Sequence, residues 1–170
     1  GFIAPLFWYL IGGLPIAFLY AGIACAAWAL GKEGYARNFG DIVLKIEKLF
    51  GFLPDIIAGI FLMVAAIFTP TAQVSRVFPL FFRREGRAKY AEGGFPLTVT
   101  AYALNVSLGG PVEDLEGSVI RHSWIGPKTA TARLDKGHLK RAIYMSVMAY
   151  VLVFAALVGG LLAWKMTVLG

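Results

Sequence analysis

Charged residues and cysteine are both scarce in this chain of 170 residues. Charged side chains make up 15% of it, against about a quarter in a typical soluble domain, whereas hydrophobic residues reach 58%. The single cysteine, Cys25, lies in an apolar stretch, which excludes both a disulfide within this sequence and a cysteine-based metal site. We therefore interpret Cys25 as a small buried hydrophobe. The composition argues against a soluble globular protein.

The common signatures of nucleotide binding and hydrolysis are also missing. The sequence contains no P-loop, no HExxH pattern and no GxSxG elbow. Its two histidines, His122 and His138, stand alone in polar stretches, where a solvated side chain is the expected state. The sequence therefore predicts no metal site. The missing P-loop does not exclude ATP, because many ligases bind it through other loops.

Three long apolar runs are the main feature that is present. Residues 1–30 and 142–164 contain no charged side chain, and residues 50–69 contain only Asp55. About 20 apolar residues in helical form cross a bilayer. The runs predict an all-α, polytopic integral membrane protein, folded as a single membrane domain over residues 1–170, with the lipid bilayer as its partner. Because the chain begins at Gly1 without a basic segment, we expect no signal peptide and interpret the sequence as a C-terminal fragment.

The apolar runs are not all expected to be simple rods. Glycine and proline in residues 12–15 predict a break in the first run, either a kinked span or a short helix and a turn before a second helix from Pro15. Residues 32–50 carry apolar side chains at helical spacing, which predicts a separate amphipathic helix on the membrane surface or against other protein. Residues 95–108 are apolar but short, which favours a buried or re-entrant helix.

The net charge of +6 comes from basic residues that flank the apolar runs. This is the pattern of juxtamembrane Lys and Arg, so we expect no nucleic-acid partner. Basic clusters at both ends of residues 70–141 place that segment in the cytoplasm and the C-terminus outside. Basic residues between positions 32 and 48 conflict with this orientation unless residues 50–69 are re-entrant or strongly tilted.

The most distinctive segment is rich in glycine and proline and lies between residues 93 and 128. Glycine pairs let a backbone approach a ligand and point several N–H groups at an anion. The alternative is that these residues only form turns at helix ends, and spacing alone favours that alternative. Catalytic residues are not assigned. The candidate substrate-binding residues are Gly94, Pro96, Asn105, Gly109, Gly110, Pro111, Arg121, His122 and Lys128.

The order of these short elements resembles the C-terminal half of the adenosylcobinamide-phosphate synthase family of cobalamin-biosynthesis membrane proteins (CbiB/CobD). Its most specific part is the Leu-Gly-Gly-Pro of residues 108–111, followed by Gly117 and by the Ile-Gly of residues 125–126. The other matching positions are residues 4–7, 12–15, 39–40, 54, 94–96 and 103–107.

The resemblance implies a multi-pass enzyme of the bacterial inner (cytoplasmic) membrane. It implies a carbon–nitrogen ligase that joins adenosylcobyric acid, a corrinoid, to an aminopropanol or its phosphate through an amide bond. ATP with Mg²⁺ is implied as the cofactor that activates the carboxylate. Asn105, Gly109 and Gly110 would shape the site, with Arg121 and Lys128 as charge partners.

Several polar motifs of that family are replaced here, at residues 21–27, 54–56, 91–96 and 121–123. The fold-forming glycines and prolines persist, so inheritance of the fold is better supported than inheritance of activity. The alternative is a non-catalytic membrane sensor or scaffold like the β-lactamase-regulation protein AmpE, whose Ala-Pro-Leu-Phe-Trp element resembles residues 4–8. A transporter is the third possibility, and only Asp55 is an ionisable residue inside a run.

Overall fold

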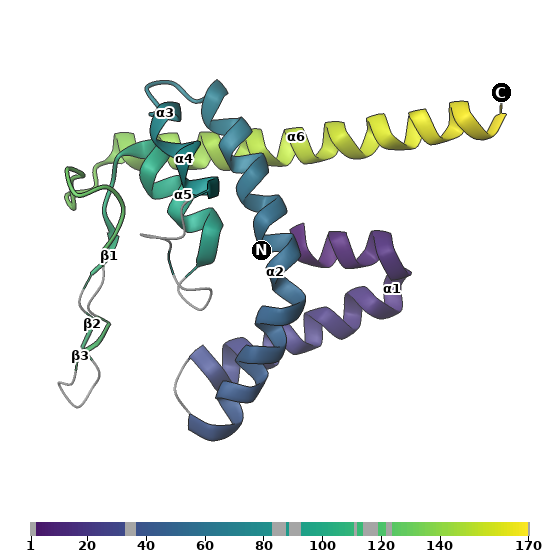
Figure 1. Cartoon of the computed structure of the whole chain (residues 1–170), viewed down its shortest axis with the longest axis horizontal. Coiled ribbons are helices and arrows are strands. Elements are labelled where there is room, and N and C mark those ends of the chain that lie inside the picture. Colours follow the sequence, from purple (N-terminus) through teal and green to yellow (C-terminus); the bar gives the residue numbers. More distant parts are fainter. Residues whose placement is uncertain are drawn as a thin grey trace. The chain divides into compact units, whose positions relative to one another are not determined.

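The computed structural model describes residues 3–32, 37–82, 88, 93–110, 112–113, 119–121 and 124–169. The chain divides into two compact units. The first unit comprises Gly1–Ala58 and Ala88–Pro96, and the second comprises Gly59–Arg87 and Leu97–Gly170. The described elements, labelled in Figure 1, are α1 (Ile3–Ala26), η1 (Ala27–Lys32), α2 (Arg37–Phe68), α3 (Val74–Val77), α4 (Pro79–Phe82), α5 (Gly94–Leu104), β1 (Leu108–Gly109), β2 (Val112–Glu113), β3 (Val119–Arg121), β4 (Trp124–Ile125) and α6 (Lys136–Leu169).

Three of the described helical segments are long and apolar enough to cross a membrane: Ile3–Ala29, Ile42–Phe68 and Lys136–Val168. Most of their surface is not covered by protein, since between 11% and 33% of each span is buried within the chain. Exposed apolar helices of this length are stable in lipid and not in water. The all-α membrane fold predicted from the three apolar runs is therefore confirmed.

Helix α1 of the first unit is broken where the sequence predicted. Gly12 and Gly13 have non-helical dihedral angles, and Gly13 has a positive φ of 71°. Figure 1 shows the two helical segments of α1 doubling back at this point. The first segment, residues 3–11, is about 14 Å long at the helical rise of about 1.5 Å per residue, too short to cross a hydrocarbon core of about 30 Å. The structure thus selects the helix, turn and second helix over the kinked span. Ile3–Ala29 is therefore of membrane length by its total length and composition, and not as one straight helix.

Cys25 lies near the end of α1 and is exposed, so the prediction of a buried cysteine is wrong. Most other residues of α1 are not buried within the protein either, since Ala4 and Tyr20 are its buried residues. Two apolar residues in the second segment of α1, Phe18 and Leu19, are 71% and 60% exposed. The reason is that an apolar sequence in lipid has no need to hide its side chains inside the protein.

Helix α2 runs without interruption from Arg37 to Phe68, so the expected separate helix over residues 32–50 is wrong. Its apolar stripe does not pack on other protein either. Ile42, Ile46 and Leu49 are 55%, 41% and 75% exposed, whereas Glu47 is 6% exposed. An exposed apolar stripe on a helix that continues into a membrane-length apolar segment is typical of a lipid-facing surface.

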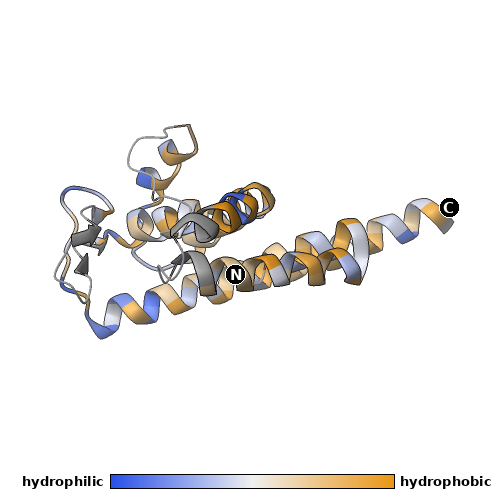
Figure 2. Cartoon of the chain, turned by 90° about the horizontal axis from the view of Figure 1, so that it is seen from below, coloured by the Kyte–Doolittle hydropathy of each residue, from blue (hydrophilic) through white to orange (hydrophobic). Residues whose placement is uncertain are grey.

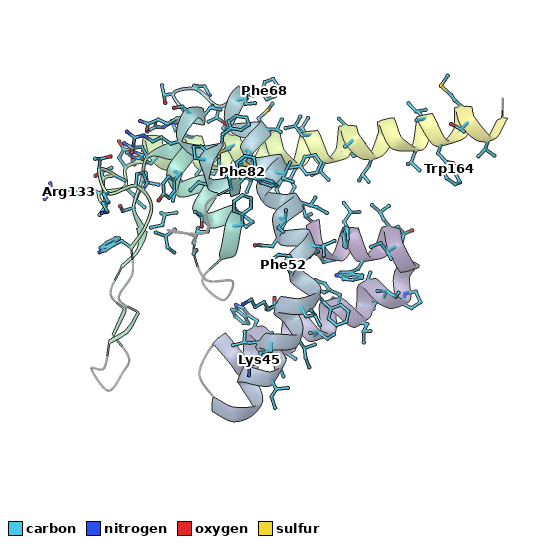
Figure 3. The ribbon with its side chains drawn as sticks, viewed as in Figure 1. Lys45, Phe52, Phe68, Phe82, Arg133 and Trp164 are labelled. Atoms are coloured by element: carbon cyan, nitrogen blue, oxygen red, sulfur yellow. The ribbon has the colours of Figure 1, made fainter. Side chains whose placement is uncertain are left out.

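Pro54 lies inside α2, and the chain compensates for it. Proline has no N–H group, so the carbonyl four residues earlier, that of Phe50, loses its helical partner. The indole Nε1–H of Trp8, on α1, donates to this carbonyl at 3.2 Å. The rings of Trp8 and Phe50 also make an edge contact at 5.4 Å between centroids, in the part of the first unit that Figure 3 marks by Phe52. An unpaired carbonyl in lipid is costly, so this bond explains how the helix tolerates the proline.

Helix α5 is short and enclosed, as predicted for the apolar segment after residue 95. Thr98, Val99, Ala101 and Ala103 have no exposed surface. The helix ends at Leu104, earlier than expected, because Asn105 takes a left-handed conformation with φ of 54°. A helix of 11 residues rises about 16 Å, so it does not span a bilayer.

The remainder of the second unit consists of a loop and the long helix α6. The loop holds two small antiparallel sheets, β1 with β4 and β2 with β3, which the sequence did not predict. Helix α6 contains the predicted apolar span and buries Met145, Ala149 and Val153 along one face. Figure 2 shows hydrophilic residues gathered in the loop and at the start of α6, with hydrophobic residues predominating further along the helix.

Candidate functional site

The polar side chains of the second unit gather where α3, the end of α5, the loop and the start of α6 lie. Figure 3 shows side-chain nitrogen atoms concentrated around this region, near Arg133. Two arginines make bonds there that join distant parts of the sequence, Arg76 on α3 and Arg141 on α6. Neither was among the residues that the sequence pointed to.

Arg76 is held by two neutral oxygen atoms. Its Nη1 donates to Oδ1 of Asn105 at 2.8 Å and to Oγ1 of Thr129 at 3.4 Å. These partners are 29 and 53 residues away in the sequence. Arg76 is exposed, so its guanidinium group is oriented by these two bonds and remains accessible. A guanidinium in this state matches the oxygen atoms of a phosphate or carboxylate.

Asn105 is in place because of the way α5 ends. Val106 N donates to Ala101 O at 3.0 Å and Asn105 N donates to Tyr102 O at 3.4 Å. These two bonds form a Schellman motif with Asn105 as the left-handed residue. Asparagine adopts this conformation more readily than most residues other than glycine, and here its side chain also reaches Arg76.

Arg141 fixes the turn that leads from α2 to α3. Its Nη1 donates to Oγ1 of Thr71 at 2.9 Å, and its Nε donates to the carbonyl of Gly137 at 3.3 Å. Thr71 has a positive φ of 61°, which is unusual for a β-branched residue. The backbone N–H of Gln73 donates to Ala103 O at 2.8 Å and ties the same turn to α5.

The electrostatic result is a site with uncompensated positive charge. Within the described ranges, no carboxylate pairs with Arg76 or Arg141. Exposed cationic side chains from the loop and from α6 add to the charge: Lys128, Arg133, Lys136 and Lys140. Basic groups held by neutral partners, next to other cations, form a binding site for anions.

Asp135 and His138, which lie in the sequence between the cations of the loop and those of α6, interact with each other. Oδ1 of Asp135 accepts the backbone N–H of His138 at 2.7 Å and lies 2.6 Å from Nδ1 of its ring. Asp135 is therefore the N-cap of α6. The N–H of His138, followed by its ring, lowers the pKa of Asp135 below its usual value. His138 is thus a partner in a helix cap.

Two glycines of the loop, Gly110 and Gly126, lie where another part of the chain comes close to the backbone. Gly126, with φ of 142°, lies against the carbonyl of Val106, where a side chain would not fit. Gly110, with φ of 97°, lies against the indole ring of Trp124. For Gly126 the structure supports a turn role. Gly110 is different, because the group that lies against it is the large, exposed side chain of Trp124.

The candidate residues at the start of α5 belong to the first unit. Oδ2 of Asp55, on α2, accepts the backbone N–H of Phe95 at 3.0 Å. Gly94 has φ of 59°, and a Cβ atom on it would lie 2.6 Å from the same oxygen atom. Gly94 and Pro96 therefore form a helix start that receives the Asp55 carboxylate.

Of the other candidates, Asn105, Gly109, Gly110 and Lys128 lie in the second unit. Asn105 is bonded to Arg76, and Lys128 is exposed in the turn next to Thr129. Pro111 and His122 lie outside the described residues, and Arg121 is described only as part of β3. Arg76 was missed because the basic residues that follow the second apolar run were interpreted as juxtamembrane charges.

The residues present fit the phosphate part of ATP. Arg76, Lys128 and Thr129 offer donors and positive charge to phosphate oxygen atoms. In the described part of the chain, no group of three His, Cys, Asp or Glu side chains is arranged to hold a metal ion. Magnesium bound through substrate phosphates needs only one or two carboxylates, so this finding does not bear on a magnesium ion that arrives with the nucleotide.

The fold defines a helical integral membrane protein whose loop region carries several basic side chains. A family model described as "CobD/Cbib protein" matches residues 1–146. The chain belongs to this family.

Curated relatives agree with the family match. The chain is 29% identical to "Cobalamin biosynthesis protein CobD" of Brucella melitensis over 167 residues, which is 94% of this chain and 50% of that protein. Proteins of the same name from Brucella anthropi and Klebsiella pneumoniae are 30% and 28% identical, with 94% of this chain and 50% and 49% of theirs covered. The chain thus spans about half the length of these relatives. No solved structure matches it significantly.

Proposed function

We propose that this chain acts in cobalamin biosynthesis at the bacterial inner membrane. In this proposal it is part of a carbon–nitrogen ligase that forms an amide bond between adenosylcobyric acid and an aminopropanol or its phosphate. The family match and the name of its relatives support the pathway. The observation that carries the chemistry is Arg76, an exposed guanidinium held in place by Asn105 and Thr129.

Arg76 would bind the phosphate group of a substrate. Its two neutral partners orient the guanidinium without cancelling its charge, so an incoming oxyanion meets a fixed donor. Lys128, beside Thr129, would add a second positive charge, and Arg141 would keep the turn before α3 in place. Bound ATP would supply the phosphoryl group that activates the carboxylate. Amide formation needs this activation because a free carboxylate does not react with an amine in water.

No observation on the described residues favours the alternative of a membrane sensor or scaffold. A sensor of that kind would have no need for a guanidinium directed by residues 29 and 53 positions away. A transporter is not favoured either. Asp55 lies inside a membrane-length helix, but its carboxylate caps the start of α5.

The test is complementation with a chimeric protein. The chain replaces the matched half of the Klebsiella pneumoniae relative, and growth is scored in a strain that lacks the synthase and depends on its own cobalamin. Charge-assisted hydrogen bonds contribute about 1.5–3 kcal/mol, so Arg76→Ala should reduce kcat/KM of the chimera about 10- to 100-fold. Arg76→Lys should be intermediate, because lysine keeps the charge but not the paired donors.

Lys165→Ala is the control, since Lys165 is an exposed cation near the C-terminal end of α6 and is not one of the cations that surround Arg76. It should grow like the parent chimera at equal abundance in the membrane. Growth of Arg76→Ala at the parent rate would remove Arg76 from the site. Failure of the parent chimera to grow, despite normal abundance in the membrane, would contradict the ligase function itself.

A further inference from the structure

The indole ring of Trp124 is positioned by the glycine pair of the loop. Trp124 lies directly opposite Gly109 in the pairing of β4 with β1. A Cβ atom on Gly110 would lie 2.7, 2.8 and 2.9 Å from three carbon atoms of the ring, Cζ2, Cη2 and Cε2. The ring therefore occupies the space of a side chain at position 110, and any residue larger than glycine there would displace it.

The Trp124 ring lies against Gly110, and about half of the residue is exposed. Trp124 is 53% exposed, while its neighbour Ile125 is 3% exposed and Gly110 is buried. A tryptophan whose only role was to fill the loop would be covered on both faces. A fixed, exposed indole loses little conformational freedom when a flat molecule stacks on it, which makes it a good platform for an aromatic ring.

The platform is close in sequence to the anion-binding residues. A turn at residues 127–130, closed by the bond from Ala130 N to Pro127 O at 2.9 Å, follows β4 directly. This turn carries Lys128 and Thr129, and Thr129 accepts a bond from Arg76. Thr129 follows Trp124 by five positions, so their Cα atoms lie within about 18 Å of each other. One ligand with a ring and a phosphate chain can meet both.

We propose that Trp124 stacks on the base of a purine nucleotide whose phosphates reach Arg76 and Lys128. This inference rests on the proposed function and adds the residue that recognises the base. A membrane-anchoring tryptophan is the other common role of an exposed indole. The loop does not favour that role, because its apolar residues beside Trp124, Leu108 and Ile125, are partly or fully buried. The other described neighbours are small, polar or cationic: Gly109, Gly110, Gly126, Lys128 and Thr129.

The experiment measures binding of two ligands to the protein in lipid nanodiscs. ATP contains the ring and the phosphates, and inorganic tripolyphosphate contains the phosphates alone. Removing one stacked aromatic typically weakens nucleotide binding about 5- to 150-fold. We expect Trp124→Ala to raise the Kd for ATP by this factor and to leave the Kd for tripolyphosphate unchanged. Trp124→Phe should restore most of the affinity for ATP.

Two further variants separate stacking from structural effects. Gly110→Ala should weaken ATP binding like Trp124→Ala, because the new methyl group displaces the ring. Trp164→Ala is the matched control, as Trp164 is an exposed tryptophan on α6, and it should bind both ligands normally. Arg76→Ala, in contrast, should weaken both ligands.

The outcomes distinguish this inference from the proposed function. Normal ATP affinity in Trp124→Ala would overturn the stacking role, while loss of both ligands in Arg76→Ala would leave the phosphate site standing. Equal weakening of ATP and tripolyphosphate by Trp124→Ala would show a structural role and overturn it too. In a variant with Trp124 as its one tryptophan, quenching of the fluorescence by brominated lipid, with no effect of ATP, would identify a membrane anchor instead. A wild-type protein that binds tripolyphosphate but shows no preference for ATP would also contradict it.

Discussion

At the scale of single residues, the site depends on side chains that serve the fold and the chemistry at once. Asn105 closes α5 in a Schellman motif and also orients Arg76. Gly110 takes a positive φ and also makes room for the ring of Trp124. Substitutions at these two positions therefore change the local backbone and the site together, whereas Arg76 and Trp124 can be truncated with less effect on folding because both are exposed.

The cap of α6 gives a prediction about pH. The pKa of Asp135 is lowered in the folded chain from its usual 3.8. The charged cap therefore stabilises the first turn of α6 at pH values above 3.8, and this stabilisation is lost as the pH falls through the lowered pKa. We expect Asp135→Ala to speed hydrogen exchange at the backbone amide of His138 at pH 6, relative to the parent.

The difference between Asp135→Ala and the parent should shrink as the pH is lowered below 3.8, because the parent then loses its charged cap as well. Asp135→Asn is the control, since asparagine caps helices about as well as aspartate and does not titrate. An exchange difference that stays constant down to pH 2 would contradict the role of the charge.

Asp55 and Arg76 show which features of single residues can be predicted from the sequence and which cannot. Both were recognisable as unusual, Asp55 as the one charge in its run and Arg76 as part of a basic stretch. Their roles depend on partners 40, 29 and 53 residues away. Periodicity and local motifs carry no information about such contacts. Asn105, Gly110 and Lys128 could be proposed from the sequence because glycine pairs and their neighbours are a local signal.

At the scale of elements, the glycines and prolines decide where helices break. Gly12 and Gly13 end the first segment of α1, as the sequence predicts, because both have non-helical dihedral angles. Pro54 does not end α2, because Trp8 supplies a donor to the free carbonyl of Phe50. The sequence could not show this, as a breaker and its compensating partner are 46 positions apart. Helix breaks inside a membrane are therefore predictable only where no neighbouring side chain can satisfy the backbone.

A double-mutant cycle tests the bond between Trp8 and Phe50. Trp8→Phe keeps an aromatic ring but removes the N–H donor, and it should reduce the free energy of unfolding by about 1 kcal/mol in mixed micelles. Pro54→Ala restores the helical N–H that Phe50 normally receives. In the Pro54→Ala background Trp8→Phe should therefore cost less, with a coupling of about 0.5–1.5 kcal/mol.

Trp28→Phe is the control for this cycle, because Trp28 lies on η1 with 62% of its surface exposed. It should leave the free energy of unfolding unchanged in both backgrounds. Equal costs of Trp8→Phe with and without Pro54 would show that the ring packs against α2 without replacing the missing hydrogen bond.

At the scale of the whole molecule, hydrophobic burial comes from lipid as well as from the protein. The three membrane-length helices leave most of their apolar surface uncovered within the chain. Long apolar runs are a strong signal, so the fold class was predictable from the sequence alone. The short sheets β1–β4 and β2–β3 were not, because strands of two or three residues leave no periodic pattern.

We propose the orientation of the chain from the same distribution of charge. Basic residues of the loop and the start of α6 favour the cytoplasmic side. In this proposal helix α6 would carry the chain across the membrane and place residue 168 outside. The substrate site proposed for Arg76 and Trp124 requires this arrangement.

The most direct test of this account is the labelling of single cysteines by a membrane-impermeant maleimide in intact cells. Cys25→Ser provides the background, with Ala132→Cys in the loop and Val168→Cys near the end of α6, both at exposed positions. We predict that position 168 is labelled from outside and that position 132 is labelled only after the inner membrane is permeabilised. Labelling of position 132 in intact cells, or of both positions from the same side, would contradict a membrane-spanning α6 with a cytoplasmic site.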